Sequence, residues 1–366
     1  MNPTFLRFVL IPVVQIAAVI ALVLVTVMYL VLLERKVNAW MQVRLGPMRV
    51  GWHGLMQPIA DVLKLFIKED LTPRHVDRLV FFLAPVILLL PAMAAFAVIP
   101  FSGQPIQVAG VEITPWVTDV NVGLLFLLAI SSLGVYGIVM AGWSSNSKYS
   151  MLGALRSAAQ MISYEVPLGL SVVSVLMLAG TASMVGIVRA QAAAGYWFAF
   201  WLPYPQLVGL FLYFVSGVAE TNRTPFDLPE AENELVAGFH TEYSGMKFAF
   251  FFLAEYMNMI LVGCIIAVLF LGGWLPVTLG LGHFFPSLPG ALSNFLPFWG
   301  SAGAMLTGFF WFALKVLVVL FVYLWMRATF PRYRYDQLMR LGWKWLIPLG
   351  LVHVMVTGLV MLLRRG

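Results

Sequence analysis

The sequence contains very little cysteine and histidine. Cys264 is the single cysteine in 366 residues, and the five histidines are not paired with it or with one another at metal-ligand spacing. One thiol cannot form an internal disulfide, and it cannot by itself build a zinc or iron–sulfur site. A glycine-rich nucleotide-binding loop is also missing from the sequence. The chain therefore carries no recognisable redox centre of its own.

Charged residues are also scarce for a protein of this length. Charged residues make up 10% of the chain, whereas 61% of the residues are hydrophobic. This composition excludes an ordinary soluble domain and is typical of an integral membrane protein. A spanning helix needs about 20 apolar residues, so we expect an all-α integral membrane protein with one membrane domain over residues 1–366 and eight transmembrane helices. The predicted spans lie near 10–33, 79–100, 121–143, 161–188, 197–219, 246–271, 303–325 and 343–363.

The distribution of lysine and arginine predicts an orientation. Of the 22 basic residues, 17 follow the first, third, fifth or seventh predicted span. By the positive-inside rule these loops face the cytoplasm and both termini face outward, although the Arg364–Arg365 tail weakly opposes this. The positive net charge is thus explained by membrane insertion and needs no nucleic-acid partner. We expect a bacterial inner (plasma) membrane, chiefly because the uncharged segment 273–302 is long; its role stays open.

Residues 53–68 are predicted to form an amphipathic interfacial helix. At about 100° per residue, apolar and polar side chains separate onto two faces. The apolar face has Leu55, Ile59, Val62 and Phe66, and the polar face has Gln57, Asp61, Lys64 and Lys68. This helix either lies in the headgroup plane or lines a lateral entrance for an amphipathic, lipid-like ligand. The simplest interpretation of the basic residues before it is that they snorkel, with their apolar stems along the membrane and their charged ends in water. They are Arg35, Lys36, Arg44 and Arg49.

Several ionisable residues fall inside predicted spans. Glu165 lies about one turn inside the fourth span, where a carboxylate costs roughly 2.5–3.5 kcal/mol on insertion. It either pairs with Arg156 or with a lysine of another helix, or it carries protons. The second interpretation is favoured because Glu220 sits at the same depth on the fifth span. Glu255 and Lys315, inside the sixth and seventh spans, could pair with each other or could each carry protons, and spacing does not decide.

The loop between the fifth and sixth spans is strongly acidic. Six of the 16 acids of the chain occur between residues 220 and 247, namely Glu220, Asp227, Glu230, Glu232, Glu234 and Glu242. Acids between two membrane helices more often belong to a proton, cation or polar-ligand path than to an anchor. Some of them could instead be helix caps after Thr224, or members of a solvated loop. Phe226 and the apolar residues after it argue against full solvation.

Three long motifs carry a family resemblance. They are ERKVNAWMQVRLGP with VGWHGLMQPIADVLK, then SSNSKYSMLGALRSAAQMISYEV, then AETNRTPFDLPEAENELVAGFHTEYSGMKF. In this order, and with the later RATFPRYRYDQLMRLGWK, they resemble the H-subunit family of proton-translocating NADH–quinone oxidoreductase, respiratory complex I. The resemblance covers nearly the whole chain. It implies a membrane-arm subunit at the junction with the peripheral arm, with quinone (ubiquinone or menaquinone) as substrate.

The resemblance also implies partners and site residues. Other membrane-arm subunits and peripheral-arm subunits would be the partners, and FMN and iron–sulfur clusters would lie only on those partners. The quinone chamber and its entrance are assigned to Arg35, Lys36, Gln42, Arg44, Asp61, Lys64 and Phe226. Proton coupling is assigned to Glu34, Glu165, Glu220, Asp227, Glu230, Glu232, Glu234, Glu255 and Lys315. Two departures from the family are Met48 in the GPMRVG turn and Ser131-Ser132, where some relatives place a glutamate; the second removes one possible proton station.

The implied mechanism begins with a quinone that enters laterally between the first span and the amphipathic helix. Its reduction needs two protons and creates transient negative charge near the acidic loop. Glu220 and Glu165 would pass the resulting change in protonation onward, with or without a movement of the loop. The alternatives are an anchor subunit of a related membrane-bound hydrogenase, a stand-alone proton or ion transporter, and a scaffold that only docks peripheral subunits. A transporter should show internal repeats or broken helices at the bilayer centre, and neither is evident.

Overall fold

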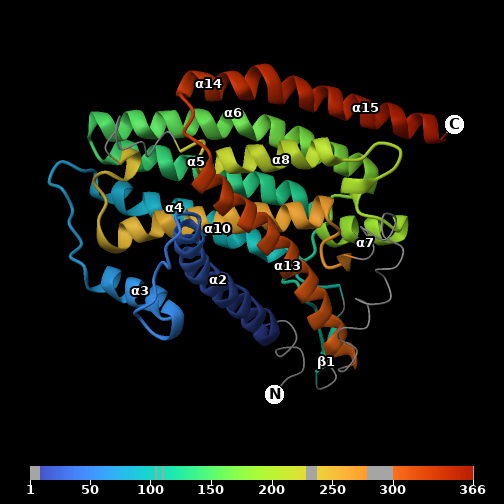
Figure 1. Cartoon of the computed structure of the whole chain (residues 1–366), viewed down its shortest axis with the longest axis horizontal. Coiled ribbons are helices and arrows are strands. Elements are labelled where there is room, and N and C mark those ends of the chain that lie inside the picture. Colours follow the sequence, from blue (N-terminus) through green and yellow to red (C-terminus); the bar gives the residue numbers. More distant parts are fainter. Residues whose placement is uncertain (1–8, 104, 109–110, 228–236, 278–299, 366) are drawn as a thin grey trace.

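The computed structural model describes residues 9–103, 105–108, 111–227, 237–277 and 300–365. Long helices lie side by side and run mainly along one direction, with α2 and α13 crossing them obliquely (Figure 1). The helices are α2 Ile11–Met41, α3 Gln57–Ile67, α4 Arg78–Ala95, α5 Gly123–Ser144, α6 Lys148–Ala179, α7 Met184–Ala194, α8 Leu207–Glu220, α10 Gly245–Phe270, α13 Gly300–Thr329, α14 Tyr335–Arg340 and α15 Ile347–Arg365. Short 3₁₀ turns are η2 Trp52–Gly54, η3 Phe96–Val98, η4 Phe198–Phe200 and η5 Gly238–His240, and a π-helical segment, η6 Leu341–Leu346, joins α14 to α15.

Seven helices in the described ranges are long and apolar enough to cross a membrane. They are α2, α4 with η3, α5, α6, α10, α13, and the continuous run from α14 to α15. In place of the predicted span at 197–219 the structure has η4 and α8. The 14 residues of α8 reach about 21 Å, less than the ~30 Å thickness of the hydrocarbon core. The all-α multi-pass architecture is confirmed, but the count of eight spans is not.

Two predicted boundaries were wrong in ways that move site residues. The first helix continues to Met41, so Glu34, Arg35 and Lys36 lie within α2 rather than in the loop after it. The fourth span begins at Lys148, not at 161, so Glu165 lies in the middle of α6 rather than one turn inside it. The apolar-run criterion missed these helical turns because they contain polar side chains, some of which, such as Glu34 and Gln160, form hydrogen bonds with other protein segments.

The predicted fourth span also ended too late. Gly180, with φ of 67°, closes α6, and left-handed φ values of this kind favour glycine at helix ends. Residues 184–194 then form the separate helix α7, which Ser183 caps by accepting a hydrogen bond from the Gly186 N–H.

The amphipathic helix forms, although it is shorter than predicted. α3 begins at Gln57, with proline in its first turn, because His53 has a non-helical φ of 52°. The apolar side chains Ile59, Val62 and Phe66 stay exposed, as expected for a helix that rests on a bilayer surface. A small hairpin was not predicted: β1 Ile106–Val108 pairs antiparallel with β2 Val111–Ile113, with Ile106 opposite Ile113.

α10 forms the centre of the core. Every residue from Met259 to Phe270 is buried, and α2, α4, α8 and α13 pack around the helix (Figure 1). A helix that is apolar on all sides and enclosed by other helices is a core element. The one strongly acidic side chain of α10, Glu255, is therefore held inside protein.

Candidate functional site

A row of alternating charges crosses one end of the bundle beside α10. We call Arg327, Glu34, Arg223 and Glu255 the buried charge ladder, after its three largely buried members; the Arg327 side chain at its outer end is 40% exposed. Its first step joins α13 to α2, where the Arg327 guanidinium contacts the Glu34 carboxylate. The hydroxyl of Tyr256, on α10, donates a hydrogen bond of 2.7 Å to the other oxygen of Glu34. The Glu34 side chain is only 8% exposed, so these contacts replace water around its charge.

Arg223 forms the middle of the ladder. Its Nη1 lies 3.9 Å from Glu34 Oε2 and its Nη2 lies 3.8 Å from Glu255 Oε2. The guanidinium also lies over the Tyr256 ring, 4.3 Å from the ring centre, where the negative ring face attracts a cation. Arg223 follows α8 directly, so it connects the start of the acidic loop to α2 and α10. A movement of this loop would change the fields at both carboxylates.

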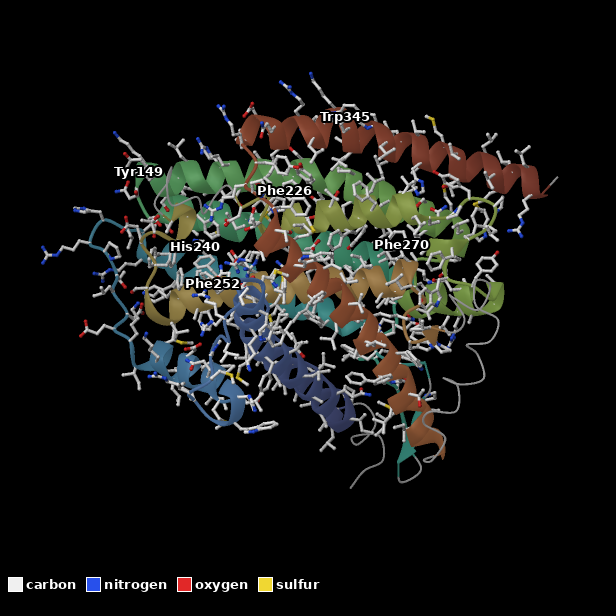
Figure 2. All side chains as sticks on the ribbon, viewed as in Figure 1. Tyr149, Phe226, His240, Phe252, Phe270 and Trp345 are labelled. Carbon is white, nitrogen blue, oxygen red and sulfur yellow. The ribbon has the colours of Figure 1, made fainter. Side chains whose placement is uncertain are left out.

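His240 extends the ladder at the Glu255 end. Its Nε2 lies 3.7 Å from Glu255 Oε1, and its Nδ1 is 3.0 Å from the carbonyl oxygen of Ala237. Aromatic rings surround the imidazole, and Figure 2 shows His240 beside Phe252, with which it stacks. Burial lowers the pKa of His240 to about 4, because a low-dielectric environment disfavours the imidazolium. The imidazole is thus neutral at physiological pH, and its contact with Glu255 is not an ion pair there.

The loop segment before the acidic stretch is fixed from two sides. The buried amide of Gln160, on α6, donates hydrogen bonds to the carbonyl oxygens of Ala219 (2.8 Å) and Phe226 (2.9 Å). The Phe226 ring lies 5.7 Å from the rings of both Tyr164 and Tyr333, and it is nearly parallel to Tyr333. The Phe226 side chain is buried. The Phe226 ring therefore packs between α6 and the connector that follows α13.

Asp227 meets a basic residue from the connector between α13 and α14. Arg332 donates a hydrogen bond of 3.1 Å to Asp227 Oδ2, and the aspartate side chain is 11% exposed. The other predicted acids of this loop, Glu230, Glu232 and Glu234, lie outside the described residues.

Glu165 and Glu220 lie on the neighbouring helices α6 and α8. The Ser132 hydroxyl of α5 donates to Glu165 Oε1, and Glu220 lines a cavity of about 20 Å³ together with Ser131. The two carboxyl groups are close enough to interact electrostatically. Arg156 cannot be the partner of Glu165, because it lies nine residues earlier in the same helix, about 14 Å along the axis.

The predicted entrance residues connect α2 to α3. Arg35 donates to Asp61 at 2.5 Å, and Gln57 donates to the other Asp61 oxygen at 3.1 Å. Lys36 donates to the carbonyl oxygen of His53 at 2.6 Å. Gln42 is the C-cap of α2 and is exposed, as are Arg44 and Lys64. Consecutive residues of α2 therefore point different ways, with Glu34 in the ladder and Arg35 and Lys36 on the amphipathic segment.

Lys315 does not pair with Glu255. Its ammonium group donates to the carbonyl oxygens of Gly273 (2.8 Å) and Leu275 (2.6 Å), and it lies 4.5 Å from the centre of the Trp197 ring. These carbonyls follow the C-terminal end of α10, where a cation is favoured by the helix dipole. Glu255 lies nearer the opposite end of α10, so the two charges belong to separate sites.

Sequence reasoning missed the partners of the predicted acids. Arg223, Arg327 and Arg332 were counted only as orientation signals and Tyr256 was given no role, yet each contacts a predicted acid. One usable signal was present, since buried carboxylates require counter-charges and the basic residues nearest to the predicted acids were candidates. The described residues contain no group of three or more His, Cys, Asp or Glu that could hold a metal ion.

Comparison with known proteins identifies close relatives. The model of the NADH dehydrogenase family matches residues 14–358. The NADH-quinone oxidoreductase H subunit 1 of Geobacter sulfurreducens is 51% identical over 96% of this chain and 94% of its own length. The corresponding H subunit 2 of Koribacter versatilis is 48% identical over 98% of both chains. The H subunit 2 of Rhizobium meliloti is 47% identical over 94% of this chain and 96% of its own length.

Proposed function

This chain belongs to the NADH dehydrogenase family, among the H subunits of NADH-quinone oxidoreductase, and on that premise we propose that it walls the quinone chamber and connects quinone reduction to proton translocation. It is a multi-pass membrane subunit of this enzyme complex. The observation that carries the proposal is the buried charge ladder, which joins α2, α10, α13 and the start of the acidic loop. Charges are costly inside a membrane protein, and they are retained there mainly for function.

The quinone would enter between α2 and α3. Arg35 connects α3 to α2 and Lys36 connects the η2 turn to α2, while the exposed apolar face of α3 suits contact with lipid and with an isoprenoid tail. Gln42, Arg44 and Lys64 are exposed near the same two helices and would contact the tail or headgroup on the way in. Phe226 and Asp227 would border the inner end of the path.

Electrons would come from an iron–sulfur cluster on a peripheral-arm partner, with FMN also on partner subunits. Reduction of quinone to quinol takes up two electrons and two protons, and it makes the headgroup transiently negative. Asp227, Glu230, Glu232 and Glu234 would respond to this charge by changing protonation, because nearby like charges compete for protons. Arg223 would then shift between Glu34 and Glu255, and the change would pass to Glu220 and Glu165. Lys315 would act at the far end of α10.

The same family membership supports the expected surroundings. The other membrane-arm subunits would cover part of the exposed apolar helix faces, and peripheral-arm subunits would dock on the side of α3 and the acidic loop. The basic residues gathered on that side support a cytoplasmic location for it in a bacterial inner membrane. With η4 and α8 as a short eighth crossing, both termini would lie outside.

The test uses the assembled complex in proteoliposomes. Glu165→Gln combined with Glu220→Gln should leave assembly intact and lower both proton translocation and coupled NADH:quinone turnover. A photoreactive quinone should label residues 34–70 or 220–247, and excess quinone should block the label. Normal turnover with a normal proton-to-electron ratio in the double variant would refute the coupling role. Label confined to partner subunits would refute the chamber role, and a defect in assembly alone would support the scaffold interpretation.

A further inference from the structure

Two adjacent serines of α5 lie between the two intramembrane glutamates. Ser131 lines the same cavity as Glu220, whereas Ser132 donates its hydroxyl hydrogen to Glu165. Both hydroxyls also lie within 3.0 Å of one backbone oxygen, that of Leu128 in the preceding turn. The serines thus face the two acids from a single helix turn.

The cavity beside Glu220 has several polar side chains in its lining. Its lining includes Ser131, Thr221 and Asn258 as well as Glu220, while the remaining lining residues, such as Leu127 and Val262, are apolar apart from Tyr213. Its volume of about 20 Å³ exceeds the ~10–15 Å³ that one water needs. A water there would also meet the second requirement, which is two or more polar partners.

The Ser132 hydroxyl has two acceptors and one hydrogen. It can donate to Leu128 O at 2.9 Å or to Glu165 Oε1. When Glu165 is a carboxylate, Ser132 donates to it. When Glu165 is protonated, the acid donates to Ser132 Oγ and the serine turns its hydrogen to Leu128 O. The hydroxyl therefore has a bonded orientation for each protonation state of Glu165.

We propose that Ser131 and Ser132, together with one water in the cavity, form a hydroxyl relay that carries a proton between Glu220 and Glu165. In one passage Glu220 gives its carboxyl proton to the water, and the water gives a proton to Ser131 Oγ. The original O–H bond of Ser131 breaks as its proton passes to Ser132 Oγ, once the two hydroxyls turn from the shared Leu128 oxygen toward each other. The original O–H bond of Ser132 breaks as its proton passes to Glu165 Oε1. Both serines end as hydroxyls, the water is restored, Glu220 is a carboxylate and Glu165 is an acid, so charge and atoms balance.

This relay rests on the proposed coupling role of the two glutamates, which it deepens. It also assigns a role to the position where some relatives place a glutamate. A carboxyl at 131 or 132 would itself store the proton, whereas hydroxyls only pass it on. In this chain the proton would therefore reside on Glu220 or on Glu165 and not between them.

The experiment compares Ser132→Ala, Ser132→Thr and the control Ser171→Ala in the assembled complex. Ser171 of α6 also bonds its own backbone, at Leu168 O, but is not bonded to a carboxylate. Ser132→Ala should slow coupled turnover about tenfold, as expected for one lost hydrogen-bonded step, and should shift the infrared carbonyl band of protonated Glu165. Ser132→Thr should restore turnover to within about twofold, because the hydroxyl is kept. Ser171→Ala should match the unmodified complex.

Glu165→Gln in the same series separates the two proposals. Slow turnover in Glu165→Gln with normal turnover and an unshifted band in Ser132→Ala would overturn the relay but keep the coupling role. Normal turnover in Glu165→Gln would overturn the coupling role itself. Equal losses in Ser132→Ala and Ser132→Thr, without the infrared shift, would also overturn the relay, since they would reflect packing.

Discussion

Replacing Tyr256 by phenylalanine tests how firmly the buried charge ladder is held. The change removes one oxygen atom and with it the 2.7 Å hydrogen bond that Tyr256 donates to Glu34. Hydrogen bonds to charged groups contribute about 1.5–3 kcal/mol. Glu34 keeps its contact with Arg327, and Arg223 stays 3.9 Å away, so the carboxylate is not left alone. We therefore expect the lower part of this range, about 1.5–2 kcal/mol.

The assay is the rate of thermal inactivation of the assembled complex, since large membrane assemblies unfold irreversibly and their stability is a rate. A loss of about 1.5–2 kcal/mol corresponds to inactivation roughly 10–30 times faster when the bond is absent from the transition state of unfolding. Tyr243→Phe is the control. Within the described residues its hydroxyl bonds Ser144 Oγ and the carbonyl oxygen of Phe81, both at 3.3 Å, and such neutral bonds contribute about 0.5–1.5 kcal/mol.

A double-variant cycle separates charge from packing. In a Glu34→Gln background the acceptor is neutral, so Tyr256→Phe should cost at least about twofold less in free energy than in the unmodified complex. Equal costs in both backgrounds, or inactivation of Tyr256→Phe at the normal rate, would show that the carboxylate does not depend on this hydroxyl. The charges of the ladder would then not depend on the Tyr256 hydroxyl for their stability.

Three further predictions concern the segments around the ladder. The pKa of His240 in the folded chain is lowered to about 4, so between about pH 4 and pH 6.5 the unfolded chain binds a proton there that the folded chain does not. The stability due to the neutral imidazole is therefore present above about pH 6.5 and is lost as the pH falls toward 4. His240→Gln should therefore flatten the pH dependence of the inactivation rate in that window, and an unchanged slope would count against it. Gly153→Ala should destabilise the protein by about 1–3 kcal/mol, because the new methyl would lie 2.8 Å from the η5 backbone. In Gly169→Ala, in the same helix, the new methyl meets nothing within 4 Å, so this change should stabilise by about 0.5–1 kcal/mol. Both effects are measured as inactivation rates, and similar rates for the two variants would refute this. Asp227→Asn should cost less than about 1 kcal/mol of stability, because the Arg332 side chain is 45% exposed and its ion pair is screened, so a drop in quinone turnover without faster inactivation is expected.

Local patterns made part of the fold predictable. The two-faced spacing of residues 57–67 is enough to identify α3, and the apolar runs locate seven spans. The patterns failed where a helix is polar because it packs on protein, as at residues 148–160 of α6, or where it continues beyond its apolar run, as at Glu34 in α2. A hydropathy profile scores how well a segment suits lipid, so it cannot detect a polar helix that packs on protein or a helix that continues beyond its apolar run.

The sequence singles out the acids of the candidate site as predictions, but it does not reveal the partners that the structure gives them. Tyr256 and Glu34 are 222 positions apart in the sequence, and no periodicity relates them. For Lys315 the sequence left pairing with Glu255 open as one alternative, and the structure instead gives it two backbone carbonyls and an indole ring. Which charge meets which is decided by how the helices pack, and that information is spread over the whole chain.

The length and polarity of α6 have a consequence for how the protein is made. Its 32 residues reach about 48 Å, and it is the least apolar of the seven candidate spans. A segment with a carboxyl group at mid-length is a poor substrate for release into lipid by itself. α5 leaves the ribosome just before it, separated by the three residues 145–147, and already holds Ser132 for Glu165. The two helices are therefore suited to leave the translocon as a pair, with the acid bonded before it meets the bilayer.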